Sequence, residues 1–262
     1  AMLPLVRSLC ACLLPGGRGP ALPHATMPSD GQRVRTIVIG DVHGCLLELR
    51  ELLAKVGYTP GADAVVLVGD LVNKGPSSAA VVAFARTEGL YCVRGNHDDT
   101  ALRKWDERDL QRRRGETPNC FDKYAYTDSF SADDVRFLRE LPYTLALPHE
   151  RAIVVHAGLV PDVPLRDQTA DDMTRMRNLL PRAEGGWRAV EKGDEGEPWA
   201  ALWPGAEHVI FGHDAKRRLQ RHAHATGLDT GCCYGGELTA LILPEHRVES
   251  VQAKREYAPK GG

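Results

Sequence analysis

Three short apolar runs in the first half of the chain each end at a glycine that polar side chains follow. The runs occupy residues 34–39, 64–68 and 91–94. Short runs rich in β-branched residues predict buried strands, and a glycine directly after each one indicates a tight exit from the strand. Apolar positions at three- and four-residue spacing predict a helix over 45–55, and a second helix follows Pro76. The order β-α-β-α-β therefore predicts parallel neighbouring strands.

Later apolar patterns predict the remaining elements. Strands are expected at 143–147, 152–155 and 209–211, helices at 133–141 and 170–180, and a closing hairpin from 238–243 and 247–251. The glycine- and glutamate-rich segment 184–198 is expected to be a mobile surface loop. The densely charged segment 103–118 indicates either a solvated helix surface or a lip that meets substrate phosphates.

Composition places the chain among ordinary globular proteins. Its 262 residues, 43% hydrophobic and 26% charged, suffice for one well-buried core. We expect an N-terminal arm or targeting segment over residues 1–32 and one domain over 33–256. A net charge of −2 and a pI near 6.6 provide no overall field that would attract nucleic acid or an anionic membrane. A polyanionic substrate must therefore be attracted locally.

The seven cysteines are odd in number and show no metal-ligand spacing. This favours reduced thiols in an intracellular protein, for which the cytoplasm is the expected location unless the N-terminal segment targets it elsewhere. No stretch approaches the roughly 18 apolar residues of a membrane span. The sequence leaves the oligomeric state open.

Candidate chemistry lies at the ends of five predicted strands. The side chains there are Asp41, His43, Asp70, Asn96, His97, His156 and His213. Open α/β sheets bind ligands at the carboxyl ends of their strands. A single histidine near a strand is usually structural, but this combination forms an oxygen and imidazole cluster suited to two divalent metal ions.

These motifs resemble those of the calcineurin-like metallophosphatases in the phosphoprotein-phosphatase superfamily. The family patterns Gly-Asp-x-His-Gly, Gly-Asp-x-x-Asp-Arg-Gly, Gly-Asn-His-Asp/Glu, His-Ala/Gly-Gly and Gly-His follow in order between residues 40 and 213. The resemblance implies an α/β fold, an αββα sandwich of two mixed β-sheets flanked by helices. One departure is Asn73-Lys74 in place of Asp-Arg. Lysine keeps the positive charge but lacks the planar, two-pronged grip of arginine on phosphate.

The segments 173–177 and 228–241 are similar to the symmetrical diadenosine tetraphosphatases and their ApaH-like relatives. The resemblance implies one metal ion on Asp41, His43 and Asp70, and a second on Asp70, Asn96, His156 and His213. Two such ions about 3.5–4 Å apart share a carboxylate and a hydroxide and stabilise an in-line displacement at phosphorus. Mn²⁺ is the expected ion, with Fe, Zn²⁺ or Co²⁺ as alternatives.

Other site residues carry two further expected roles. His97 is expected to be the general acid that protonates the leaving oxygen, with Asp98 as its orienting partner. Four cations are candidates to bind phosphate, although any of them could instead form a surface ion pair: Lys74, Arg94, Arg175 and Arg177.

The leading hypothesis is a hydrolase that cleaves a phosphoanhydride bond of a dinucleoside polyphosphate and converts diadenosine tetraphosphate to two ADP. The alternatives are a phosphoprotein Ser/Thr phosphatase and an ApaH-like hydrolase of mRNA caps or polyphosphate. A catalytically silent nucleotide-binding or scaffold protein on the same fold is the third hypothesis, but none of the seven ligand positions is lost. The expected partner is a small nucleotide substrate, with no non-specific nucleic-acid binding.

Overall fold

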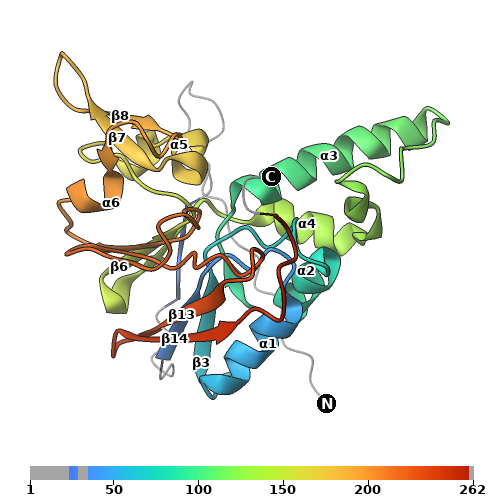
Figure 1. Ribbon diagram of the computed structural model, residues 1–262, viewed down its shortest axis with the longest axis horizontal. Coiled ribbons are helices and arrows are strands. Elements are labelled where there is room, and N and C mark those ends of the chain that lie inside the picture. The colour runs from blue at the N-terminus through green and yellow to red at the C-terminus, as the bar shows by residue number, and fades with distance from the viewer. Residues whose placement is uncertain (1–23, 29–34, 260–262) are drawn as a thin grey trace.

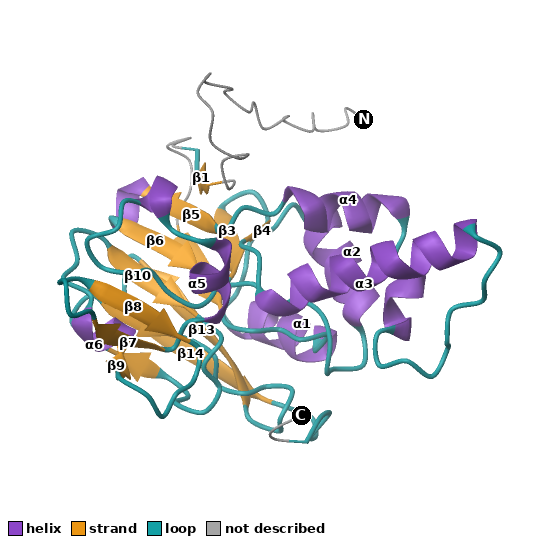
Figure 2. Cartoon of the chain, turned by 90° about the horizontal axis from the view of Figure 1, so that it is seen from above, coloured by secondary structure: helices purple, strands orange, loops and turns teal. Residues whose placement is uncertain are grey.

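Two β-sheets pack face to face, and helices cover their outer faces (Figures 1 and 2). The structure is a computed structural model that describes residues 24–28 and 35–259. In its described part the first sheet has the order β14-β13-β2-β3-β4 and the second the order β1-β5-β6-β10-β12-β11. This is the expected αββα sandwich of two mixed sheets.

The strands of the first sheet are β2 (Arg35–Ile39), β3 (Asp63–Leu67), β4 (Tyr91–Cys92), β13 (Glu237–Leu243) and β14 (Arg247–Gln252). Those of the second are β1 (His24–Thr26), β5 (Thr144–Leu147), β6 (Ala152–Val155), β10 (His208–Phe211), β11 (Gln220–Arg221) and β12 (Ala225–Gly227). Strands β2, β3 and β4 run parallel, as predicted, and β13 and β14 form the predicted hairpin.

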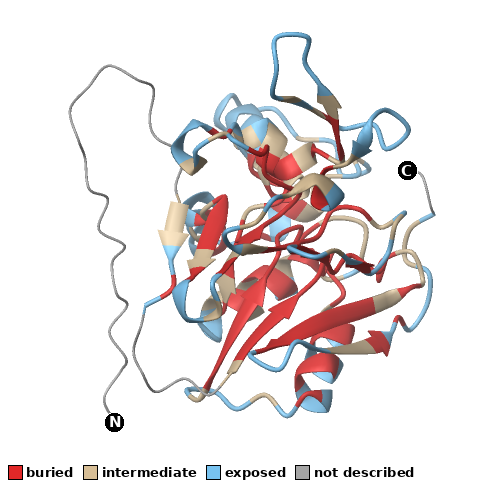
Figure 3. Ribbon diagram, turned by 90° about the vertical axis from the view of Figure 1, so that its left-hand side faces the viewer, coloured by how far each residue is buried: buried red, intermediate tan, exposed pale blue. Residues whose placement is uncertain are grey.

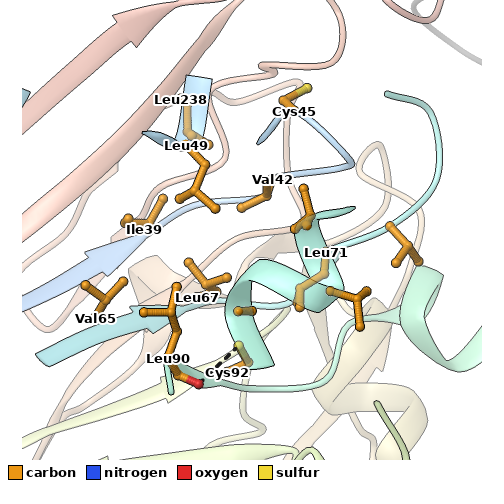
Figure 4. Close-up of a cluster of buried hydrophobic side chains, with 14 of the residues drawn as sticks. Ile39, Val42, Cys45, Leu49, Val65, Leu67, Leu71, Leu90, Cys92 and Leu238 are labelled. Carbon is orange, nitrogen blue, oxygen red and sulfur yellow. Dashed lines mark hydrogen bonds between the residues drawn. The ribbon is translucent and has the colours of Figure 1, made fainter. Parts of the chain in front are cut away.

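Strand β2 shows why the apolar runs are continuous. Ile37 and Ile39 face the helices of the first outer layer, whereas Val38 faces the second sheet. A strand with both faces covered is therefore apolar at nearly every position. Figure 3 shows this burial through the middle of both sheets, and Figure 4 shows Ile39, Leu49 and Leu67 in the layer between β2, β3 and the helices.

Helices α1–α4 lie together on one side of the first sheet (Figure 2). They are α1 (Leu46–Lys55), α2 (Ser78–Thr87), α3 (Asn96–Arg113) and α4 (Ala132–Glu140). Outside the second sheet lie α5 (Ala170–Arg175), α6 (Trp199–Leu202) and a small sheet of β7 (Asn178–Pro181), β8 (Trp187–Val190) and β9 (Glu197–Pro198). Trp199 packs there on Phe211, with ring centroids 4.8 Å apart.

Two predictions for this outer layer were wrong. The helix expected over 170–180 ends at Arg175, and the chain continues as strand β7. The loop expected over 184–198 contains strands β8 and β9, which pair with β7. The side-chain amide of Asn178 donates to the carbonyl of Glu195 at 2.7 Å, so long-range pairing outweighs the local helical pattern.

Three residues of the predicted N-terminal arm belong to the second sheet. His24–Thr26 forms β1, which pairs in parallel with β5. Residues 1–23 and 29–34 lie outside the described residues, so the predicted arm and the boundary at residue 33 stay predictions. Within the described part of the chain, no helix combines the length and apolar character needed to cross a membrane.

Leucine positions on two helices offer a matched test of this core. Leu138 on α4 is fully buried, whereas Leu110 on α3 is 48% exposed. We expect Leu138→Ala to lower the free energy of unfolding by about 2–5 kcal/mol because it leaves a cavity. Leu110→Ala should change it by about 0.5 kcal/mol or less. Denaturant unfolding of both variants measures the difference, and equal losses would contradict the layer assignment.

Candidate metal centre and substrate pocket

The polar side chains from the strand ends of both sheets meet at one edge of the sandwich. Asp41 and Asp70 follow β2 and β3, and Asn96 begins α3 after β4. The second sheet adds His156 after β6 and His213 after β10. Parallel strands deliver their carboxyl ends to the same edge, so residues far apart in sequence become neighbours.

Asp70 lies at the centre of this cluster and is 1% exposed. Its Oδ2 is 3.4 Å from Nε2 of His43, and its Oδ1 is 3.5 Å from Nε2 of His156. The backbone N–H of His97 donates to Oδ1 at 2.9 Å. Two groups of side chains could hold a metal ion here, and Asp70 belongs to both: His43 with Asp70 and His97, and Asp41 with Asp70 and His156.

Backbone carbonyls hold the histidines in fixed orientations. Nδ1 of His43 is 2.9 Å from the carbonyl of Val72, and Nδ1 of His156 is 2.9 Å from that of Val68. Nε2 of His213 is 3.0 Å from a third carbonyl, leaving its Nδ1 available. One ring nitrogen of each histidine is thus used, and the other remains as a metal donor. Nε2 of His156 also lies 3.1 Å from Oδ1 of Asn96.

Burial determines the charge states of these groups. It lowers the pKa of His43 to about 3 and the pKa of His156 and His213 below the usual value, so all three imidazoles are neutral at pH 7. Burial, with the charges of Asp229 and Asp70, raises the pKa of Asp41 well above its usual value. Burial alone would also raise the pKa of Asp70, but nearby imidazoles and Lys74 outweigh it and lower that pKa.

Neutral imidazoles, an amide oxygen and crowded, buried carboxylates are a donor set that fits divalent ions. A cation among them would remove the repulsion that raises the pKa of Asp41. The residues present therefore fit the metal ions that the family resemblance implies.

The backbone around the cluster adopts conformations that are rare for residues with side chains. His43, Asp70 and His213 have φ angles of 43°, 50° and 66°. Such left-handed conformations persist only where the surrounding structure enforces them, and they concentrate at functional sites. Gly95 also lies so close that a Cβ there would be 2.2 Å from Oδ1 of Asp70.

The prediction that Asp98 orients His97 was wrong. Both oxygens of Asp98 accept backbone hydrogen bonds, at 3.0 Å from Leu71 and 2.9 Å from Gly95, and its side chain is fully buried. Asn73 instead contacts the ring: its Nδ2 is 2.8 Å from Nδ1 of His97. Oδ1 of Asn73 accepts the N–H of Lys74, so the amide is oriented to donate to His97. Sequence reasoning noted Asn73 but missed this contact.

The structure brings only two of the four predicted phosphate-binding cations to the pocket. Lys74 and Arg177 line it. Arg94 is turned away, because its guanidinium donates to the carbonyl of Leu138 and pairs with Asp99, so that prediction was wrong. Nor does Arg175 line the pocket. Its side chain pairs with Asp171 at 3.1 Å.

The pocket over the cluster has a volume of about 560 Å³. Five polar or charged residues of its lining were not among the predicted site residues: Glu191, Lys216, Arg218, Asp229 and Tyr234. Lys216 and Arg218 could have been predicted, because they follow within five residues of His213, at the end of the same strand. No ion pair among the described residues includes either cation. The ammonium of Lys74 lies 5.0 Å from the ring centroid of Tyr234 and 3.1 Å from Nε2 of His43.

The charged segment 103–118 does not reach this pocket. Most of it belongs to α3, where Arg108 and Arg112 both pair with Asp128. None of its residues lines the pocket over the cluster, so the alternative of a phosphate-binding lip was wrong and the solvated helix surface describes it.

Two packed mixed sheets with this donor set at their edge define the metallophosphatase class of fold. The calcineurin-like phosphoesterase family matches residues 34–217, and the chain belongs to that family. Members of the family bind divalent metal ions. A yeast protein serine/threonine phosphatase shares the fold alone, at 16% identity and a TM-score of 0.55 over 89% of this chain and 84% of its own.

Nearer relatives are dinucleoside tetraphosphatases. A solved structure of a candidate diadenosine tetraphosphatase is 38% identical, with a TM-score of 0.78, over 88% of this chain and 98% of its own. The symmetrical bis(5'-nucleosyl)-tetraphosphatase of Erwinia tasmaniensis is 30% identical over 84% of this chain and 98% of its own. The asymmetrical enzyme of Halalkalibacterium halodurans is 28% identical over 83% and 94%.

A substitution at Gly95 tests whether the close packing around Asp70 matters. We expect Gly95→Ala to displace the carboxylate and to weaken Mn²⁺ binding about tenfold or more. Gly193→Ala is the control, because a Cβ there would meet its nearest neighbour at an ordinary 3.7 Å. Equilibrium dialysis measures both affinities. Unchanged Mn²⁺ binding by Gly95→Ala would show that Asp70 does not hold the ion.

Proposed function

We propose that the chain is a metal-dependent hydrolase that cleaves a phosphoanhydride bond of dinucleoside polyphosphates and converts diadenosine tetraphosphate to two ADP. One observation carries this proposal: four cations line the same pocket as the carboxylate and imidazole cluster. They are Lys74, Arg177, Lys216 and Arg218. A polyphosphate chain carries several negative charges close together, and such a row of cations complements it.

The proposed ligands follow the family pattern. Asp41, His43 and Asp70 hold one ion, and Asp70 with Asn96, His156 and His213 holds the other. We expect Mn²⁺, with Fe, Zn²⁺ or Co²⁺ as alternatives that the donor set accepts. When bound, the two ions polarise the phosphate and supply the nucleophile for an in-line displacement.

In the proposed mechanism, His97 protonates the leaving oxygen. The acid in this step is the imidazolium form of the ring, which becomes neutral when Nε2 gives up its proton. Nε2 lies 3.9 Å from Oδ2 of Asp70, and His97 lines the pocket. Asn73 contacts the other ring nitrogen, Nδ1, at 2.8 Å.

Lys74 neutralises phosphate charge. Its ammonium lies 3.1 Å from Nε2 of His43, so a metal ion held by that nitrogen would displace the ammonium and leave it free to bind phosphate. Burial alone would lower the pKa of Lys74, but the charge of Asp70 and the contact with Tyr234 together raise it, which keeps the group charged.

Asymmetrical cleavage is the second candidate, because the enzyme of Halalkalibacterium halodurans is asymmetrical by name. Cleavage between the two central phosphates yields two ADP, whereas cleavage one bond away yields ATP and AMP. The remaining alternatives are hydrolysis of mRNA caps, of polyphosphate or of phosphoproteins. The likeness to the yeast phosphatase concerns the fold alone and does not favour the last of these.

Product analysis with a substrate panel tests the function. Metal-free protein should be inactive, and added Mn²⁺ should restore conversion of diadenosine tetraphosphate to ADP. Asp70→Asn should abolish turnover because it removes the charge that both ions share. Asp194→Asn, a change at an exposed position, should leave turnover unchanged. Chromatography of the nucleotides gives the products.

The panel also contains capped RNA, polyphosphate and a phosphopeptide. If the products are ATP and AMP, the enzyme cleaves the substrate asymmetrically and the proposal of symmetrical cleavage is wrong. Faster turnover of the phosphopeptide than of any dinucleotide would refute the dinucleotide function.

The role of His97 is tested by separating turnover from metal content. We expect His97→Ala to lower kcat by about 10²–10⁴ while the amount of bound metal stays the same. The loss should shrink on a nitrophenyl phosphate ester, because its leaving group needs no proton. His149→Ala, at an exposed histidine, is the control. His97 also belongs to a group that could hold an ion. Loss of metal from His97→Ala would therefore make it a ligand and not the acid.

A further inference from the structure

A second group of potential metal ligands lies beneath the pocket and shares no residue with the proposed catalytic centre. It consists of Cys45, Glu48 and Cys232, whose donor atoms all lie within 4.8 Å of one another. Cys45 precedes helix α1, on which Glu48 lies one turn further. Cys232 lies in the loop between β12 and β13, directly after the pocket residue Gly231. Figure 4 shows Cys45 beside Val42 and Leu49.

The three side chains are enclosed. Cys45 and Glu48 have no exposed surface, and Cys232 is 1% exposed. In a tetrahedral zinc site, with Zn–S near 2.3 Å and Zn–O near 2.0–2.2 Å, the ligand atoms are roughly 3.4–3.8 Å apart. Small side-chain rotations would bring the three donors to that separation.

Glu48 is the feature that points to a ligand. Its Oε1 accepts hydrogen bonds from the backbone N–H of Lys254 at 3.0 Å and the hydroxyl of Tyr257 at 2.7 Å. Its Oε2 is buried and has no hydrogen-bond partner, and no ion pair among the described residues includes Glu48. Burying a carboxylate oxygen without a hydrogen-bond partner costs folding free energy, and a cation beside the oxygen would reduce that cost.

The thiol of Cys232 needs such a cation to ionise. A hydrogen bond with Cys45, then burial, raises the pKa of Cys232, and the charge of Glu48 adds to the shift. The Cys232 thiol is therefore protonated in the free protein at neutral pH. A metal ion reverses this balance, because only the thiolate binds it.

We propose that Cys45, Glu48 and Cys232 form a separate structural site for a thiophilic divalent cation, with Zn²⁺ as the natural occupant. Binding releases the two thiol protons to solvent and forms two Zn–S bonds and one Zn–O bond. The sulfur donors select Zn²⁺, whereas the oxygen and imidazole donors of the catalytic cluster suit Mn²⁺. The ion ties the start of α1 to the loop that carries Gly231 and Tyr234.

Cobalt reports on this site selectively, because thiolate ligands produce an intense near-ultraviolet charge-transfer band with Co²⁺ and oxygen or imidazole ligands do not. Reduced, metal-free protein is titrated with Co²⁺. We expect the band, its loss when Zn²⁺ is added, and one more equivalent of bound Co²⁺ than in Cys232→Ser or Cys45→Ser. Cys92→Ser removes a buried thiol elsewhere and should keep the band.

Glu48→Gln keeps both thiols, so it tests the proposed metal site even if the serine variants fail to fold. It should weaken Co²⁺ binding at this site about tenfold or more. Three results would overturn the proposal: no band in the wild-type protein at saturating Co²⁺, a band that survives in Cys232→Ser or is unaffected in Glu48→Gln, or a Cys45–Cys232 disulfide in the purified protein. None of these results would contradict the proposed hydrolase function, which product analysis tests separately.

Discussion

The burial of one carboxylate, that of Asp70, constrains the whole active edge of this molecule. A charged group with 1% exposure is stable only if cations or hydrogen-bond donors surround it. The backbone N–H of His97 is one such donor. His43 from the first sheet and His156 from the second turn unprotonated Nε2 atoms toward the carboxylate, the arrangement expected around a shared cation. The cluster therefore exists only while the two sheets are packed together. Left-handed backbone at the strand exits and the absence of a side chain at Gly95 follow from the same requirement, because each lets groups approach this carboxylate.

The parts of this arrangement that local sequence encodes could be predicted. Strand β2 is apolar from Ile37 to Ile39 because both of its faces are covered there, and an uninterrupted run is easily recognised. Parallel order then follows from the long helical connections to β3 and β4. Asp41, Asp70 and the histidines could be predicted to converge because each directly follows such a run, and the carboxyl ends of parallel strands share an edge.

The parts that depend on long-range contacts could not be predicted. The helical pattern over 170–180 is real, but β7 gains pairing with β8 and β9, which the local sequence does not contain. Arg94 follows a strand like the true site residues, yet its guanidinium turns to the end of α4. For Asp98 a signal did exist. It is the third residue of α3, the position at which an acidic side chain reaches back to the backbone before the helix.

The loops at this edge border two sets of donors of different chemistry. Residues 41–45 carry Asp41 and His43 on the pocket side and the Cys45 thiol on the core side, where Glu48 is buried. The loop after β12 repeats this division, with Asp229 and Tyr234 lining the pocket and Cys232 packed in the core. Thiol donors favour thiophilic ions such as Zn²⁺, whereas the oxygen and imidazole donors also suit Mn²⁺, so the two sets differ in the ions they prefer. A pocket of the size needed for a polyphosphate chain can thus be open to solvent, since side chains of the same loops are packed in the hydrophobic core.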